Sequence, residues 1–209
     1  MDVSAAQALG EEAMDLFSDI KVRHEQVQST SRSSSGNARS LCCAARISIS
    51  TPSCLSCCQG MGGSFTHFYH ATYHAIDLLC PTGTPVVAVA DGVITEVKQD
   101  SHVTGIHARN LFAWNSLSLR IDGSACLIEY VHIKAESALV AVGDHVKQGQ
   151  VLCLSGDVGF CPMPHLHFQV LEGEAADAAT VPFQLLGDDG PYVPQAGRWY
   201  GVTGEMPPG

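Results

Sequence analysis

The pattern of apolar and polar residues changes after Gly62. From there on, short apolar runs alternate with turn sequences such as Pro81-Thr-Gly-Thr and Asp122-Gly123-Ser124, a pattern typical of strands joined by tight turns. No helical period runs through this region. We therefore predict an all-β domain rather than alternating strands and helices. The expected strands are residues 76–79, 86–90, 93–98, 115–121, 126–133, 146–154 and 166–171.

The two ends of the chain differ from this central part. Residues 1–61 are predicted to form an N-terminal extension, with a short amphipathic helix in the first 25 residues and then a Ser- and Cys-rich linker. The linker prediction follows because residues 26–61 contain no Asp or Glu and few large apolar side chains. Residues 62–186 are predicted to form the β domain, and the Gly- and Pro-rich residues 187–209 a tail without regular structure.

Charge and hydropathy exclude several classes of function. The 209 residues include 11 Lys and Arg against 21 Asp and Glu, a formal net charge of −10, which argues against nucleic acid or anionic lipid as a partner. No apolar run approaches the roughly 20 residues of a membrane span. The N-terminus lacks the features of a secretory signal, so a cytoplasmic location is the default expectation. The acid-free residues 26–61 also fit an organellar transit peptide, if the true start lies further along the chain.

Nine cysteines, an odd number, cannot all pair within the chain, and we expect free thiols in a reducing compartment. Five of them crowd into residues 42–58, where Cys54-x-x-Cys57 has the spacing of metal ligands. No second pair follows at zinc-finger spacing, so we interpret this segment as unstructured. Cys161 is interpreted as a small buried thiol rather than as a ligand.

The histidines carry the strongest chemical signal. His165 and His167 are two residues apart on a predicted strand, so both side chains lie on the same face. Asp77 stands within an apolar strand, where an ionised carboxylate is costly unless it faces a cation. Histidine and carboxylate ligands with one open position are typical of hydrolytic zinc sites. We therefore predict a metal ion between these two strands.

Several motifs occur in the order found in one family. They are Phe65-Thr-His67, His74-Ala-Ile-Asp77, Gly83-Thr-Pro-Val-Val-Ala88, Asp91-Gly92-Val-Ile, Tyr130-Val-His132, Val142-Gly-Asp-His-Val-Lys-Gln-Gly149 and Pro164-His-Leu-His167-Phe. Over residues 63–172 the chain resembles the lysostaphin/LytM-type zinc metallopeptidases. The resemblance implies an antiparallel, sandwich- or barrel-like β core of the duplicated hybrid motif kind. It also implies one zinc ion, held by a first His together with Asp77 and His167.

The first ligand has three candidates. Many members of this family carry a His four residues before the Asp, where this chain has Tyr73. His74 is three residues before Asp77, an odd separation that points the two side chains to opposite faces of a strand. A subset of the family instead has a Phe-Thr-His motif on a preceding segment, which makes His67 the expected ligand here. His70 and His74 remain as alternatives.

The resemblance also implies roles for the two remaining histidines. His165 would act as general base toward a metal-activated water, and His132 would hydrogen-bond the tetrahedral intermediate. The predicted function is zinc-dependent hydrolysis of peptide bonds in peptidoglycan or other peptides of small residues. The alternative is a non-catalytic zinc-binding or signalling module of the same fold. Because His132 and His165 are both present, the sequence favours the enzyme.

Overall fold

The computed structural model describes residues 44–45, 55–174, 178–188, 190–201 and 204–206. Within these ranges the regular structure consists of strands and one short 3-10 helix, η1 (Ala108–Asn110). The predicted all-β fold class is confirmed. The described residues contain no helix long and apolar enough to cross a membrane.

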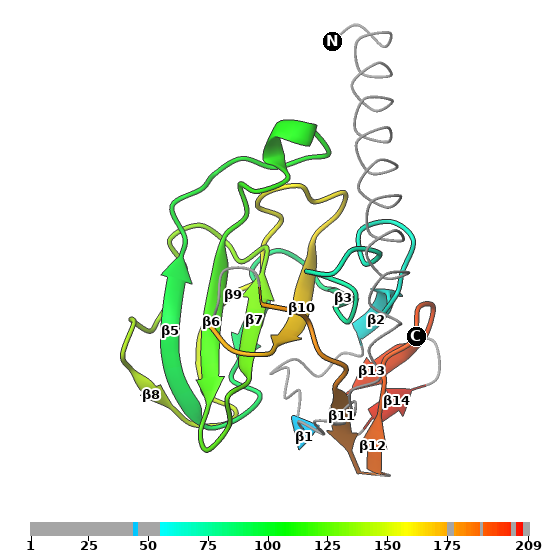
Figure 1. Ribbon diagram of the computed structural model, residues 1–209. Helices are drawn as coiled ribbons and strands as arrows, with labels where there is room; N and C mark the ends of the chain where they lie inside the picture. Colours follow the sequence, from blue (N-terminus) through cyan, green and yellow to red (C-terminus); the bar gives the residue numbers. More distant parts are fainter. Residues whose placement is uncertain (1–43, 46–54, 175–177, 189, 202–203, 207–209) are drawn as a thin grey trace, which may run out of the picture.

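A nine-stranded sheet forms the main layer (Figure 1). All neighbouring strands in it are antiparallel. The order across the sheet is β14 (Gly204–Met206), β13 (Trp199–Gly201), β2 (Leu55–Gln59), β3 (Ile76–Leu79), β10 (His165–Leu171), β7 (Leu127–Val131), β6 (Ser116–Ile121), β5 (Gly92–Lys98) and β8 (His145–Val146).

A two-stranded ribbon covers the apolar face of this sheet. It consists of β4 (Pro85–Val87) and β9 (Val151–Leu154). Side chains of both layers, among them Val86, Leu152 and Phe168, belong to one buried core. The Val89 amide donates a hydrogen bond of 3.0 Å to the hydroxyl of Tyr130, which ties the ribbon to β7. The opposite face of the main sheet is left free to carry polar residues.

Most predicted strands lie close to where they were expected, with one clear exception. Residues 76–79 form β3 as predicted, but the expected strand 146–154 is two strands, β8 and β9, in different sheets. A turn separates them, closed by a hydrogen bond of 2.9 Å from the Gln150 amide to the Lys147 carbonyl. Gly149 within it has a φ of 83°, a conformation that ends strand geometry.

The prediction for the two ends of the chain was wrong where the structure describes them. Residues 55–59 were expected in a linker, yet they form β2, which pairs with β3 and with β13. The tail was expected to lack regular structure, yet it contributes β13, β14 and β12 (Gly190–Tyr192). β12 joins a small sheet with β1 (Ala44–Ala45) and β11 (Gln184–Gly187).

The N-terminal end pairs with β3 and β11, and the C-terminal end pairs with β2 and β11. These pairings use open strand edges, which local composition does not reveal. The expected helix in residues 1–25 and most of the Cys-rich segment, Cys54 included, lie outside the described residues. The domain boundaries at 61 and 187 remain predictions.

Candidate metal centre

Strand alternation places the polar residues of β10 on the free face of the main sheet. His165, His167 and Gln169 point to this face, whereas Leu166 and Phe168 belong to the core. In the antiparallel register of β10 and β3, His167 is directly opposite Asp77. The two strands therefore bring together residues that are 90 positions apart in the sequence.

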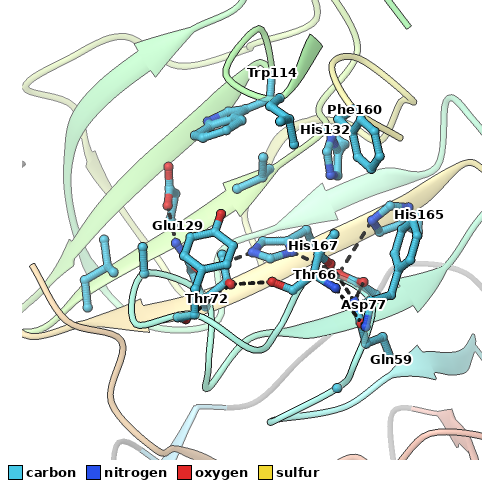
Figure 2. A pocket seen from close by; sticks show the side chains of 18 of the residues that line it. Gln59, Thr66, Thr72, Asp77, Trp114, Glu129, His132, Phe160, His165 and His167 are labelled. Carbon is cyan, nitrogen blue, oxygen red and sulfur yellow. Dashed lines mark hydrogen bonds and ion pairs between the residues drawn. The ribbon is translucent and has the colours of Figure 1, made fainter. Parts of the chain in front are cut away.

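His67 joins this pair from the loop between β2 and β3. Its Nε2 atom lies 3.2 Å from His167 Nδ1 and 3.2 Å from Asp77 Oδ1. The third side of the triangle, from His167 Nδ1 to Asp77 Oδ1, is 3.0 Å. All three residues are buried, and the structure brings their ligand atoms together; Figure 2 shows Asp77 and His167 side by side.

The triangle is slightly smaller than one face of a tetrahedral zinc site. Zinc binds imidazole nitrogen and carboxylate oxygen at about 2.0–2.2 Å, so two such ligands in tetrahedral geometry are about 3.3–3.5 Å apart. The observed distances of 3.0–3.2 Å match one face of such a tetrahedron with slight contraction. The donor set of two imidazoles and one carboxylate also suits this ion.

The loop around His67 fixes which of its nitrogens faces the site. Its Nδ1–H donates to the Gly60 carbonyl at 3.0 Å, which leaves the Nε2 lone pair directed at Asp77 and His167. The Thr72 hydroxyl donates to the Thr66 carbonyl at 2.6 Å and closes the loop.

The two alternative ligands lie elsewhere. His70 is exposed, and the ring of His74 is engaged with the Thr180 carbonyl at 2.8 Å through Nδ1. Neither belongs to a group of converging ligand atoms among the described residues.

Gln59 orients the carboxylate of Asp77 from the other side. Its Nε2 donates to Asp77 Oδ2 at 2.8 Å and to the Thr66 hydroxyl at 2.7 Å. Its Oε1 accepts the backbone amides of Phe65 and Thr66 at 3.1 and 3.0 Å. One side chain therefore links Asp77 to the loop that carries His67.

The ionised form of Asp77 is strongly favoured. Burial alone would raise its pKa, but hydrogen bonds and attraction from His167 and His67 outweigh burial and hold the pKa well below its usual value. Burial likewise acts to lower the pKa of His167, and its contact with Asp77 outweighs this and raises it. The carboxylate thus stands as a fixed negative charge among imidazoles, an arrangement that attracts a cation.

A hydrogen-bonded chain leads from His167 to β7. The Nε2–H of His167 donates to Gln169 Oε1 at 3.1 Å, and Gln169 Nε2 donates to Glu129 Oε2 at 2.6 Å. Gln169 and Glu129 are register partners on β10 and β7. The chain holds one proton of His167 on Nε2. The proton on Nδ1 is donated to Asp77 Oδ1 at 3.0 Å, and a cation bound at the site would displace it. Burial raises the pKa of Glu129 above its usual value.

His132 and His165 face the site without belonging to the triangle. The Nδ1–H of His165 donates to the Met163 carbonyl at 2.8 Å, while its Nε2 lies 3.5 Å from Asp77 Oδ1. The Nδ1–H of His132 donates to the Val158 carbonyl at 2.7 Å. The two rings are 4.6 Å apart between centroids. Each ring therefore directs an unprotonated nitrogen toward the space beside Asp77.

These two imidazoles stay neutral at neutral pH. Burial and the nearby rings of His165 and His167 lower the pKa of His132 to about 3. Burial also lowers the pKa of His165. His132 has a positive φ of 63° at the end of β7, a costly backbone conformation of the kind that concentrates at functional sites.

Comparison with known proteins identifies the family of this chain. The model of peptidase family M23 matches residues 71–178, just over half of the chain. The chain belongs to peptidase family M23. His67 lies four residues before the matched range, so its assignment within this M23 chain rests on the triangle described above.

Curated M23 relatives are larger proteins. Lysostaphin of Staphylococcus staphylolyticus is 29% identical over 132 residues, 63% of this chain and 24% of the relative. Glycyl-glycine endopeptidase ALE-1 of Staphylococcus capitis is 33% identical over 97 residues, 46% of this chain and 24% of the relative. The chain thus spans about a quarter of the length of these relatives. The solved structure of lysostaphin from Staphylococcus simulans aligns with a TM-score of 0.47 at 26% identity, covering 61% of this chain and 47% of that chain.

A cavity of about 870 Å³ opens over the triangle of this M23 chain. Asp77, His165 and His167 line one side of it, and His132 lies across from them beside Phe160 and Trp114 (Figure 2). The aromatic residues that line the cavity are Phe65, Tyr69, Phe112, Trp114 and Phe160. Its volume lies within the range of about 300–1,000 Å³ typical of ligand pockets, so it has room for a short peptide segment.

Sequence reasoning missed three residues of this site. Gln59 was placed in a linker, and nothing in its local sequence signals a role. Gln169 and Glu129 were not singled out, although alternation along β10 places Gln169 on the same face as His167. Cys161, interpreted as a plain buried thiol, lies 3.3 Å from His165 Nδ1.

Proposed function

We propose that the chain is a zinc-dependent metalloendopeptidase. The observation that carries the proposal is the triangle of ligand atoms from His67, Asp77 and His167, whose sides of 3.0–3.2 Å fit one face of a tetrahedral ion. Membership of a peptidase family supports it. When bound, zinc lowers the pKa of water toward neutrality and polarises a carbonyl group.

His165 is proposed as the general base. Its Nδ1–H is held by the Met163 carbonyl, so Nε2 carries the lone pair and lies beside Asp77. Because its pKa is lowered from the usual value by burial, this nitrogen is unprotonated at neutral pH and able to take a proton from water. The same nitrogen then delivers the proton to the leaving amine.

His132 is proposed to act first as a hydrogen-bond acceptor. With Nδ1–H donated to the Val158 carbonyl and a pKa of about 3, its Nε2 offers a lone pair to the cavity. It can therefore orient a water molecule or a substrate N–H group. Through the same lone pair it can accept a hydrogen bond from the hydroxyl group that the added water leaves on the tetrahedral intermediate. A binding module needs neither this group nor His165 in such a pose.

The proposed substrates are peptidoglycan-type peptides or other peptides with small residues. Relatives of this chain include proteins named glycyl-glycine endopeptidase and peptidoglycan DD-endopeptidase. The cavity supports this class because its open, aromatic-lined shape can receive an extended backbone. The described residues that line the cavity include no Lys or Arg. The negative charge of Asp77 is therefore balanced only by the neighbouring imidazoles.

Metal analysis of the purified chain tests the proposal, with His67→Ala and His74→Ala compared side by side. After loading with one equivalent of zinc, we expect wild type and His74→Ala each to hold one ion at the triangle and to hydrolyse a glycyl peptide, and His67→Ala to lose both the ion of the triangle and this hydrolysis. His74 is the matched control because it sits on the same loop and contacts Thr180 instead. Unchanged zinc affinity together with unchanged hydrolysis in His67→Ala would show that the triangle is not the ligand set.

A further inference from the structure

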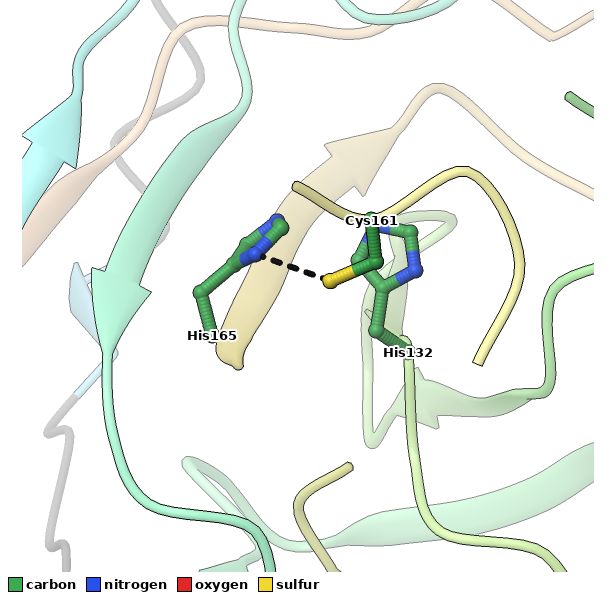
Figure 3. A group of neighbouring side chains, drawn as sticks. All are labelled: His132, Cys161 and His165. Atoms are coloured by element: carbon green, nitrogen blue, oxygen red, sulfur yellow. Dashed lines mark hydrogen bonds between the residues drawn. The ribbon is translucent and has the colours of Figure 1, made fainter. Parts of the chain in front are cut away.

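A second group of ligand atoms lies beside the first. His132, Cys161 and His165 are all buried, and one ligand atom from each lies within 4.8 Å of the others (Figure 3). Three different segments supply them: the end of β7, the loop before β10 and the first residue of β10. Two of these residues are the histidines that the first triangle does not use.

The geometry of this group suits a metal ion. Cys161 Sγ lies 3.3 Å from His165 Nδ1. A tetrahedral zinc ion with a sulfur ligand at about 2.3 Å and a nitrogen ligand at about 2.0–2.1 Å requires about 3.5–3.6 Å between them. One thiolate and two imidazoles form a donor set that selects borderline or soft ions such as zinc and cadmium.

From this convergence we propose that His132, Cys161 and His165 form a second, inhibitory site for a divalent ion. In the metal-free protein the Cys161 thiol donates to the Met163 carbonyl at 2.9 Å, and His165 Nδ1–H donates to the same oxygen at 2.8 Å. An incoming ion displaces both hydrogens: the thiol proton of Cys161 leaves to solvent, and the ring proton of His165 moves from Nδ1 to Nε2. The remaining ligand is the free ring nitrogen of His132.

An ion bound at this site blocks the two histidines on which the proposed function depends. Once Nδ1 of His165 binds an ion, the ring keeps its proton on Nε2, and that nitrogen can no longer take a proton from water. The free nitrogen of His132 is also withdrawn from the cavity. This consequence rests on the proposed function. The binding of the ion itself does not.

Titration with Co²⁺ tests the site, because a thiolate ligand gives Co²⁺ a charge-transfer absorption that the sulfur-free triangle cannot produce. We expect wild type to bind two ions and to show this absorption. Cys161→Ser should lose the absorption and keep one ion. Cys58→Ser, the matched control, changes a thiol that lines the same cavity outside the group and should keep both ions.

Two further variants separate this proposal from the proposed function. Asp77→Asn should lose the ion of the triangle and keep the thiolate absorption. His132→Asn should weaken the second ion by at least about 100-fold, since loss of an outer-shell partner alone costs up to that much. An absorption that is absent from wild type, or unchanged in Cys161→Ser and His132→Asn, would overturn the second site whatever the peptidase assay shows.

The activity assay then addresses inhibition. With one equivalent of zinc the wild type should hydrolyse a glycyl peptide, and excess zinc should inhibit it. Cys161→Ser should need at least about 100-fold more free zinc for the same inhibition. Equal sensitivity of the two proteins to zinc would overturn the inhibitory role.

Discussion

Replacement of Gln59 by Leu should damage both the stability and the metal affinity of the protein. Gln59 makes three hydrogen bonds to neutral groups of Phe65 and Thr66 and one to the ionised Asp77. Each neutral hydrogen bond contributes about 1 kcal/mol and the charged one about 2 kcal/mol, so the free energy of unfolding can fall by at most about 5 kcal/mol. Water can reach part of the loop, so we expect a loss of about 3–5 kcal/mol. Leu has a similar size and cannot replace any of the four bonds.

Urea unfolding of the zinc-free protein measures the loss of stability, and competition with a chelator measures zinc affinity. We expect affinity to fall by about 10–100-fold, as for other partners that orient a metal ligand. Gln148→Leu is the control, since its amide makes one bond of 2.9 Å to the Val89 carbonyl and should cost about 1 kcal/mol. A Gln59→Leu protein within about 0.5 kcal/mol of wild type, the range of ordinary surface changes, with unchanged zinc affinity would refute this reasoning.

Three other predictions concern the same site. His165→Ala should keep its zinc and lose about 100-fold or more in kcat; metal analysis beside kinetics checks this, and a zinc-free variant would contradict it. Zinc at about 100 times its Kd should stabilise the wild type by about 2.7 kcal/mol, a shift in thermal unfolding that EDTA reverses and that His167→Ala should lack. Glu129 has a raised pKa in the folded state, so its ionisation opposes folding and the cost grows as pH rises above the unfolded value of 4.5. In zinc-free protein, Glu129→Gln should therefore melt higher than wild type at about pH 7 and equally at about pH 3.5; a difference that does not change with pH would exclude this cause.

Two simple rules applied to the sequence pointed to Asp77 and the His165/His167 pair, and the family resemblance implied the rest of the ligand set. Alternation places His165 and His167 on one face, and a carboxylate in an apolar strand needs a cation. His67 required the resemblance to a family, since its loop has no periodic pattern. The structure supplied the reason that it fits, namely the Gly60 carbonyl that fixes its tautomer.

The parts that sequence could not predict depend on contacts between distant segments. β2 lies in a Ser- and Cys-rich stretch where no strand was predicted. Its pairing with β3 and β13 depends on strand edges that exist only after the sheet forms. Gln59 has a role only because that pairing places it beside Asp77. Cys161 looked like an ordinary thiol because His132, its neighbour in space, is 29 residues away in the sequence.

The position of β2 between β3 and β13 has a practical consequence for anyone who shortens this chain. The family match begins at residue 71 and ends at 178, so a fragment cut to those limits would lack β2, β13 and the His67 loop. The hydrogen-bonding edge of β3, which carries Asp77, would then face solvent and invite pairing between molecules. Such a fragment should aggregate and fail to retain metal, although it contains the whole of the family match.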